Sequence, residues 1–196
     1  MFDHKFLDAY SHTILQSTSI EEIHWFAKHT LRNKLASKQW LVEELTNIFM
    51  PKKLCILGSW YGIILPYMLR SADSVTCVDV DPSLRILTDA FNNRVYETNH
   101  VKYVCADARN FINASSDSFD CVINTSCEHM PYDMKDVIWD TRPVYAFQSN
   151  NYDIPEHINF KTSLDQFIQS TGLNNILYCG IKKMRSYDRY MVIGKL

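Results

Sequence analysis

The sequence predicts an α/β protein of three layers, with helices on both faces of a mostly parallel sheet of seven strands. Short apolar runs alternate with segments of helical periodicity after residue 50, which is typical of parallel strands joined by crossover helices. The first apolar run ends at a glycine turn, as in open sheets that bind ligands at their carboxyl edge. The last two runs, 175–181 and 190–193, are joined by a short segment, which predicts a C-terminal antiparallel hairpin.

Composition is that of an ordinary globular protein: 196 residues, 46% hydrophobic and 21% charged. We expect one domain over 1–196, with a helical N-terminal extension at 1–50 and the α/β core at 51–196. The net charge of −2 carries no strong nucleic-acid signal. No apolar stretch approaches the roughly 18 residues of a membrane helix, so no membrane partner is expected. Nothing in the sequence indicates the oligomeric state.

The six cysteines have no spacing typical of metal ligands, so no metal site is expected. Five of them fall within predicted strands, where a free thiol behaves as a small apolar side chain. A reduced, cytoplasmic protein is the simplest interpretation. Cys127 lies outside the strand cores, but no activating partner identifies it as a nucleophile.

Two helices are expected in the N-terminal extension. Ser19 precedes an apolar set at helical spacing, and a second helix is expected after Ser37. Pro51 ends that second helix. The histidines of this segment are scattered, and we expect them on the surface or on helix faces.

The glycine turn follows the first predicted strand, 54–57. Gly58 and Gly62 flank the turn, and a helix is expected over 64–69, with Pro66 delaying or kinking it. Glycines and helix-start amides let a ligand approach the main chain closely. Alone, this pattern is more often a simple connection than a binding site.

A second strand, 75–78, ends in Asp79-Val80-Asp81-Pro82. A carboxylate at the end of the second strand of a βαβ unit accepts hydrogen bonds from ribose hydroxyls. Asp81 is suited to cap the helix that Pro82 starts. We therefore expect Asp81 to cap and Asp79 to bind ribose.

The remaining elements follow the same alternation. A helix is expected after Pro82, and Asp107 follows the third strand, either as a helix N-cap or in adenine recognition, which its sheet edge favours. Gly172 is expected to stop the last helix. The expected ranges are strands at 101–105, 119–124 and 144–148, a loop at 149–155 and a helix at 162–170.

These segments, in this order and spacing across roughly residues 50–130, resemble the successive motifs of class I S-adenosylmethionine-dependent methyltransferases. The resemblance implies a Rossmann-like fold and S-adenosylmethionine as the cofactor. It implies that the glycine loop lies beside the methionine part of the cofactor, that Asp79 holds the ribose hydroxyls, and that Asp107 faces the adenine amino group with Ala108. The cofactor-binding set expected from it comprises Gly58, Ser59, Trp60, Gly62, Asp79, Val80, Asp107, Ala108 and Asn124.

The glycine loop departs from the family pattern at two positions. Trp60 stands where the middle glycine is usual, and Ile56 where an acidic residue is usual. The indole could form a wall of the pocket, contribute a cation–π attraction to the sulfonium, or fill the pocket.

The densest polar cluster follows the fourth strand, at residues 125–132. Asn124, Glu128 and His129 are the candidate catalytic residues, because by the resemblance this segment lies beside the transferred methyl group. A histidine or glutamate can take a proton from the attacking atom. Alternatively, Glu128 and His129 pair with each other or cap the next helix. The aromatic and amide residues between Trp139 and Tyr152, and His157, suit the substrate side or simply the core.

The function expected is methyl transfer to an unidentified acceptor, a small molecule or a protein side chain. A catalytically inactive binding or scaffold protein with the same fold is the alternative that Trp60 and Ile56 favour. A nicotinamide-dependent enzyme fits less well, because Asp79 follows the glycine turn after few residues and because the final strands are expected to form an antiparallel hairpin. Asn124 is followed by Thr125 and Ser126. By resemblance, this counts against methylation of base amino groups.

Overall fold

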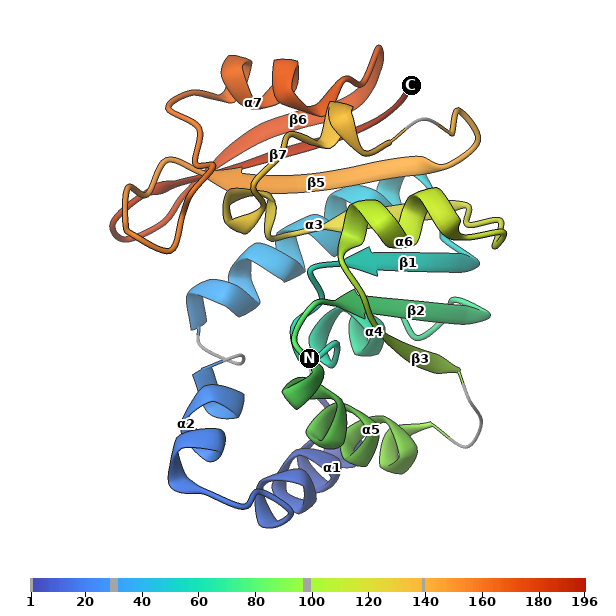
Figure 1. Cartoon of the computed structure of the whole chain (residues 1–196), viewed down its shortest axis with the longest axis vertical. Coiled ribbons are helices and arrows are strands. Elements are labelled where there is room, and N and C mark those ends of the chain that lie inside the picture. Colours follow the sequence, from blue (N-terminus) through green and yellow to red (C-terminus); the bar gives the residue numbers. More distant parts are fainter. Residues whose placement is uncertain (1, 29–31, 97–99, 139) are drawn as a thin grey trace.

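The computed structural model describes residues 2–28, 32–96, 100–138 and 140–196. Its seven-stranded sheet has the order β3-β2-β1-β4-β5-β7-β6 (Figure 1). The strands are β1 Lys53–Leu57, β2 Ser74–Asp79, β3 Val101–Cys105, β4 Cys121–Asn124, β5 Val144–Asn150, β6 Asn175–Lys183 and β7 Asp188–Lys195. Strands β1 to β5 pair in parallel, whereas β7 runs antiparallel between β5 and β6. The predicted mostly parallel sheet with a C-terminal hairpin is confirmed.

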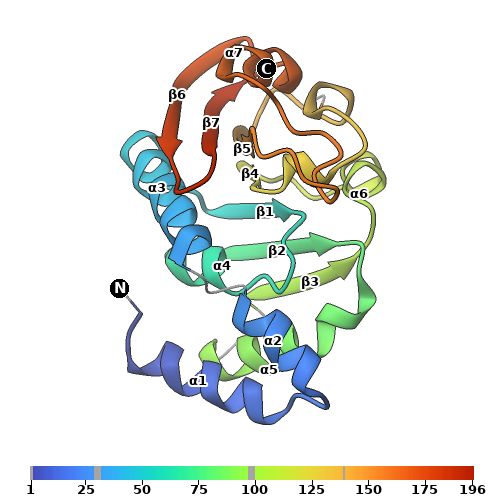
Figure 2. The same ribbon diagram turned by 90° about the vertical axis from the view of Figure 1, so that its left-hand side faces the viewer.

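Helices cover both faces of the sheet. The α-helices are α1 His4–Leu15, α2 Ile20–Lys28, α3 Arg32–Ile48, α4 Ile64–Met68, α5 Arg85–Val95, α6 Ala108–Ala114 and α7 Leu164–Thr171, and the 3-10 turns are η1 Pro82–Leu84, η2 Cys127–His129 and η3 Met134–Asp136. Figure 2 shows α1, α2 and α5 together beside the β3 edge of the sheet. Within the described residues, no helix has the length and apolar character needed to cross a bilayer.

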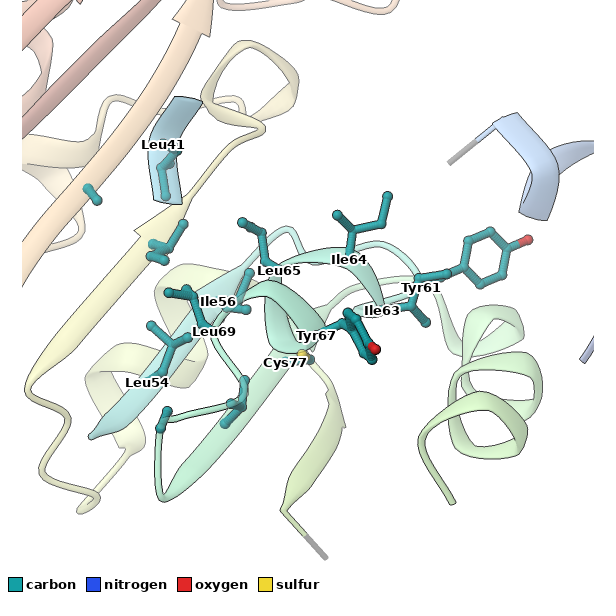
Figure 3. Packing of buried hydrophobic residues seen from close by; sticks show 14 of the residues in the cluster. Leu41, Leu54, Ile56, Tyr61, Ile63, Ile64, Leu65, Tyr67, Leu69 and Cys77 are labelled. Carbon is teal, nitrogen blue, oxygen red and sulfur yellow. The ribbon is translucent and has the colours of Figure 1, made fainter. Parts of the chain in front are cut away.

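Alternation along each strand divides the core into two clusters, because successive side chains of a strand point to opposite faces. Leu54 and Ile56 of β1 join the cluster under α3, α4 and α5, whereas Cys55 and Leu57 join the cluster under α6 and α7. In Figure 3, Leu65 and Leu69 of the α4 segment lie beside Ile56 and Leu54. The central strands are buried on both faces, which explains why they read as continuous apolar runs.

Several predicted boundaries are wrong at the edges of elements. Helix α3 begins at Arg32 rather than after Ser37, whose buried hydroxyl instead donates to Gln148 Oε1 at 2.8 Å. Strand β5 continues through Asn150, where a loop was expected, because Asn150 pairs with Arg189. Pairing with a neighbouring strand likewise lengthens β6 and β7 into the expected connection, which leaves 184–187 as the hairpin tip.

Other predicted stops are confirmed. Helix α3 ends at Ile48, before Pro51, and Gly172 caps α7 with a left-handed φ of 74°. Asp81 accepts the Ser83 N–H at the start of η1, as a cap should. The helix expected over 64–69 is the single-turn helix α4, and Pro66 lies in its first turn, where the missing N–H would have no partner within the helix.

Gly62 is a glycine of the turn after β1 whose replacement should cost stability. Its φ is 55°, and a Cβ there would lie 2.8 Å from the Cys77 sulfur on β2. We expect Gly62→Ala to lower the free energy of unfolding by about 1–3 kcal/mol, measured by urea denaturation. Adding Cys77→Ala removes the contact with the sulfur and leaves the one with Cys77 Cβ at 3.0 Å, so the double-mutant cycle should show coupling between the two sites. Additive effects would contradict this origin of the strain.

Candidate active site

A cavity of about 790 Å³ opens at the carboxyl edge of the parallel strands. Its volume is within the range of small-molecule sites, about 300–1,000 Å³. The walls come from the turn after β1, the ends of β2 and β3, the segment after β4, the loop after β5, strand β7, and helices α2 and α3. The cavity therefore lies where β1 and β4 diverge to opposite crossovers, the usual ligand position in such sheets.

The turn after β1 is held in a left-handed backbone conformation at Gly58, Trp60 and Gly62, with φ values of 58°, 52° and 55°. Positive φ is strained for a residue with a bulky side chain such as tryptophan, and such strain gathers at functional sites. A Cβ at Gly58 would lie 3.1 Å from Ser126 Cβ, so this glycine also lets the segment after β4 approach. Glycine is thus required at both flanks of the turn.

Asp79 ties the turn to the end of β2. Its Oδ2 accepts the Trp60 N–H at 2.7 Å, and its Oδ1 accepts the Asp81 N–H at 3.2 Å. Burial raises the pKa of Asp79, and these backbone N–H groups partly oppose that shift by stabilising the carboxylate. The carboxylate lines the cavity. Each oxygen retains acceptor capacity for a further donor, such as a ribose hydroxyl.

Trp60 forms part of the cavity wall, beside which the 790 Å³ space remains. The indole stacks on Tyr61 with ring centroids 5.7 Å apart and meets Trp25 of α2 edge-on at 6.3 Å. The Lys34 ammonium lies 3.8 Å from its ring centroid. These contacts fix the indole against the N-terminal helices, and its cation–π partner here is Lys34.

Asp107 is an N-cap, the alternative left open from the sequence. One oxygen accepts the Asn110 N–H of α6 at 3.0 Å, and the other accepts the Tyr132 hydroxyl at 3.1 Å. Asp107 also lines the cavity, as do Ala108 and Val80. The carboxylate is thus positioned by two protein donors at the same edge as Asp79.

Glu128 and Arg189 form a buried ion pair on the other side of the cavity. Glu128 Oε1 accepts from Arg189 Nη1 at 2.5 Å and from Asn150 Nδ2 at 2.7 Å, and Arg189 Nη2 donates to the Thr125 carbonyl. Both side chains are less than a tenth exposed. Among the described residues, Glu128 Oε2 and Arg189 Nε are buried without a partner. A pair of this kind is costly to break, because one buried charge would be left alone.

His129 and His157 stand side by side, with ring centroids 4.7 Å apart. His129 Nδ1 donates to the Glu156 carbonyl at 2.9 Å and His157 Nδ1 to the Tyr152 carbonyl at 2.8 Å, which leaves each Nε2 as an acceptor. Burial lowers the pKa of His129. Glu128 pairs with Arg189, and no described contact joins Glu128 and His129 to each other.

No metal site was expected from the spacing of the cysteines, but His129 and His157 are side chains of a type that binds metal ions. Glu128, His129 and His157 each offer a ligand atom within 4.8 Å of the other two, a spacing compatible with a metal ion. Arg189 already neutralises Glu128, and Lys34 and Lys38 line the same cavity. These positive charges oppose a divalent cation there.

Asn124, a candidate from the sequence, does not line the cavity. It is fully buried; its Nδ2 contacts the sulfurs of Met130 and Met134, and its Oδ1 accepts the Ser126 N–H at 2.8 Å. The side chain therefore shapes the segment after β4 instead of facing a ligand. Cys127 is also buried and burial raises the pKa of its thiol, which opposes a nucleophilic role. Trp139 lies outside the described residues.

The cavity residues missed from the sequence include three cations: Lys34 and Lys38 on α3, and Arg189 on β7. Burial lowers the pKa of Lys38 to about 7 and of Lys34 to about 8, and neighbouring cations add to both shifts. Lys34 and Lys38 are four residues apart, so one helix face carries both. The spacing of the two lysines could have predicted from the sequence that they share a helix face. The position of Arg189 could not be predicted in this way, because it depends on the register of β7.

Lys38 should destabilise the folded protein at neutral pH. Its folded pKa lies below the unfolded value of about 10.4, so the unfolded chain binds more protons and stability rises with pH above 7. We expect Lys38→Met to be more stable than the wild type at pH 7, with the difference shrinking toward pH 8.5. Chemical denaturation across this range measures it. If Lys38→Met were less stable than the wild type by the same amount at every pH, the charge of Lys38 would not destabilise the folded protein.

Residues 56–140 match the family model of a methyltransferase domain, and no curated protein matches the sequence significantly. The N-methyltransferase NodS from Bradyrhizobium japonicum WM9, solved with S-adenosyl-L-homocysteine, has a TM-score of 0.65 at 10% identity, covering 98% of this chain and 99% of NodS. An O-methyltransferase family protein from Burkholderia thailandensis has a TM-score of 0.61 at 10% identity, covering 96% and 69%.

The fold is also shared with an enzyme that is named as a cyclase and not as a methyltransferase. The [4+2]-cyclase SpnF has a TM-score of 0.65 at 11% identity, covering 83% of this chain and 81% of SpnF. At these identities the likeness concerns the fold. The predicted Rossmann-like methyltransferase fold is thereby confirmed.

Proposed function

We propose that this chain, whose residues 56–140 form a methyltransferase domain on a class I Rossmann-like fold, binds S-adenosylmethionine and transfers its methyl group to an acceptor. The observation that carries the proposal is the position of Asp79. Its carboxylate lies at the end of β2, bonded to the turn after β1 and open to a cavity large enough for the cofactor. Ribose hydroxyls are the donors that such a carboxylate accepts in nucleotide sites.

In this proposal the two ends of the cavity have different tasks. The turn 58–62, Asp79, Val80, Asp107 and Ala108 hold the adenosine and the methionine part. Glu128 and His129 serve the acceptor, which is a small molecule or a side chain that can enter the cavity. Tyr152 and Tyr187, whose rings stack at 5.4 Å, line the cavity on the acceptor side.

The chemistry divides between cofactor and protein. S-adenosylmethionine supplies an activated methyl group on a sulfonium, ready for in-line attack. The chain's residues align the acceptor and exclude water, and His129 Nε2 takes the acceptor's proton. A pKa lowered by burial keeps this imidazole neutral at pH 7, so Nε2 retains its lone pair. Glu128, held by Arg189 and Asn150, presents its second oxygen to the acceptor.

The second candidate function is a protein that binds the cofactor without methyl transfer, favoured by Trp60 within the strained turn. The name of SpnF illustrates that this fold also serves reactions other than methyl transfer. Incubating the purified chain with methyl-labelled S-adenosylmethionine and a cell extract separates the candidates. Label in a small molecule that separates chromatographically from S-adenosylmethionine, and that is absent without the purified chain, identifies a small acceptor. Label in protein identifies a side chain, and cofactor binding without label transfer supports the second candidate.

Asp79→Asn should weaken S-adenosylmethionine binding by about 10- to 100-fold, the size of lost hydrogen bonds to a charged group. The matched control is Asp89→Asn, which removes the same charge on α5 outside the cavity and breaks only the surface pair with Arg85. Isothermal titration calorimetry measures both. Equal affinity in Asp79→Asn and the wild type would remove Asp79 from the cofactor site.

His129→Gln should lower methyl transfer by about 100-fold or more while leaving S-adenosylhomocysteine affinity unchanged, because it removes a base and no cofactor contact. The wild-type rate should fall on acidification below pH about 6.5, where an ordinary imidazole charges, with a midpoint lower still. The variant should lack this acidic limb. An identical pH profile in both proteins would show that His129 takes no proton.

A further inference from the structure

We propose that the acceptor end of the cavity is an anion subsite built by Lys34, Lys38 and Arg189, and that the acceptor carries a carboxylate or phosphate group. The inference rests on the proposed function in one respect, because only that function gives the protein a methyl acceptor. The subsite itself follows from the charges and contacts of the chain.

Charge is unevenly distributed along the cavity. The acids Asp79, Asp81 and Asp107 line the end formed by β2 and β3. Arg189 lies on β7, and its charge acts on both Lys38 and Lys34, while the Lys34 ammonium also contacts the ring of Trp60 in the turn after β1. The cations are Lys28, Lys34, Lys38 and Arg189, and the acids near them that line the cavity are Glu128 and Glu156. Since Glu128 is already paired with Arg189, positive charge is left in excess.

Lys34 and Lys38 repel each other on one face of α3. Like charges four residues apart destabilise a helix. Among the described residues, neither ammonium forms an ion pair, and the contact of Lys34 is with the face of Trp60. Burial and the nearby cations lower both pKa values. An anion between them would relieve this repulsion and favour both charged forms.

Arg189 supplies an independent observation. It is 7% exposed and lines the cavity, with Nη1 and Nη2 occupied by Glu128 and the Thr125 carbonyl. Its buried Nε has no partner among the described residues, a state that costs stability unless a ligand accepts the N–H. A guanidinium is suited to carboxylate and phosphate oxygens, because its N–H groups form a planar fork.

The strand order favours the acceptor over the cofactor as the source of the anion. Asp79 ends β2, while Arg189 lies on β7, four strands away in the order β2-β1-β4-β5-β7. Glu128, the partner of Arg189, belongs to the segment after β4 that the proposed function gives to the acceptor. The methionine carboxylate of the cofactor is the other source, and binding measurements separate the two.

The test uses the full chain and two probes, inorganic phosphate and acetate, titrated at constant ionic strength into the protein saturated with S-adenosylhomocysteine. We expect each anion to raise the melting temperature of the wild type. In Lys38→Met and Lys34→Met the apparent Kd should increase about tenfold. Lys102→Met, an exposed lysine on β3 outside the cavity, is the control with the same charge change and should behave as the wild type.

Two outcomes overturn the proposal. One is an anion response that is absent in the wild type or equal in wild type and Lys38→Met. The other is a Lys38→Met variant that binds S-adenosylhomocysteine more weakly but 5′-methylthioadenosine, which lacks the amino-acid carboxylate, as the wild type does; the lysine would then serve the cofactor. The anion titration does not depend on turnover. An absence of methyl transfer in the labelling experiment would therefore refute the proposed function and leave the anion subsite standing.

Discussion

The hydrogen bonds of Asp79 join the first two strands at the edge where the cavity opens. Parallel pairing of β1 with β2 and β4 brings three strand ends together, and the Asp79 carboxylate then holds the Trp60 N–H of the intervening turn. Gly58 and Gly62 are needed because the turn is left-handed and closely packed on Ser126 and Cys77. Without this connection, the cavity would lose the wall that the turn after β1 forms.

The cavity combines two opposite electrostatic environments. Carboxylates at one end are stabilised by backbone N–H groups, as at Asp79, or by helix capping, as at Asp107. At the other end, a buried guanidinium and two lysines of depressed pKa surround one carboxylate. Such unpaired charge is retained at a cost in stability, which is usual for functional sites.

Local sequence signals located the residues at the ends of β1 and β2 that line the cavity. Gly58, Gly62 and Asp79 follow short apolar runs, so their positions depend only on strand ends, which periodicity locates. The end of the cavity near β7 depends on pairings between residues far apart in the sequence. Arg189 reaches Glu128 only because β7 inserts beside β5 in a given register. The position of Asn124, buried against the sulfurs of two methionines and outside the cavity lining, likewise depends on tertiary packing. The boundary of α3 was missed since Ser37, a typical cap, here bonds to Gln148.

The insertion of β7 between β5 and β6 has a consequence for synthesis on the ribosome. A nascent chain that has emerged only through residue 183 has no strand to pair with the open side of β5, and Glu128 has no guanidinium beside it. Exposed edges of this kind attract foreign strands, and a carboxylate at that depth stays unneutralised. The side of the pocket that Arg189 and Glu128 line can therefore be completed only after the chain has emerged through β7.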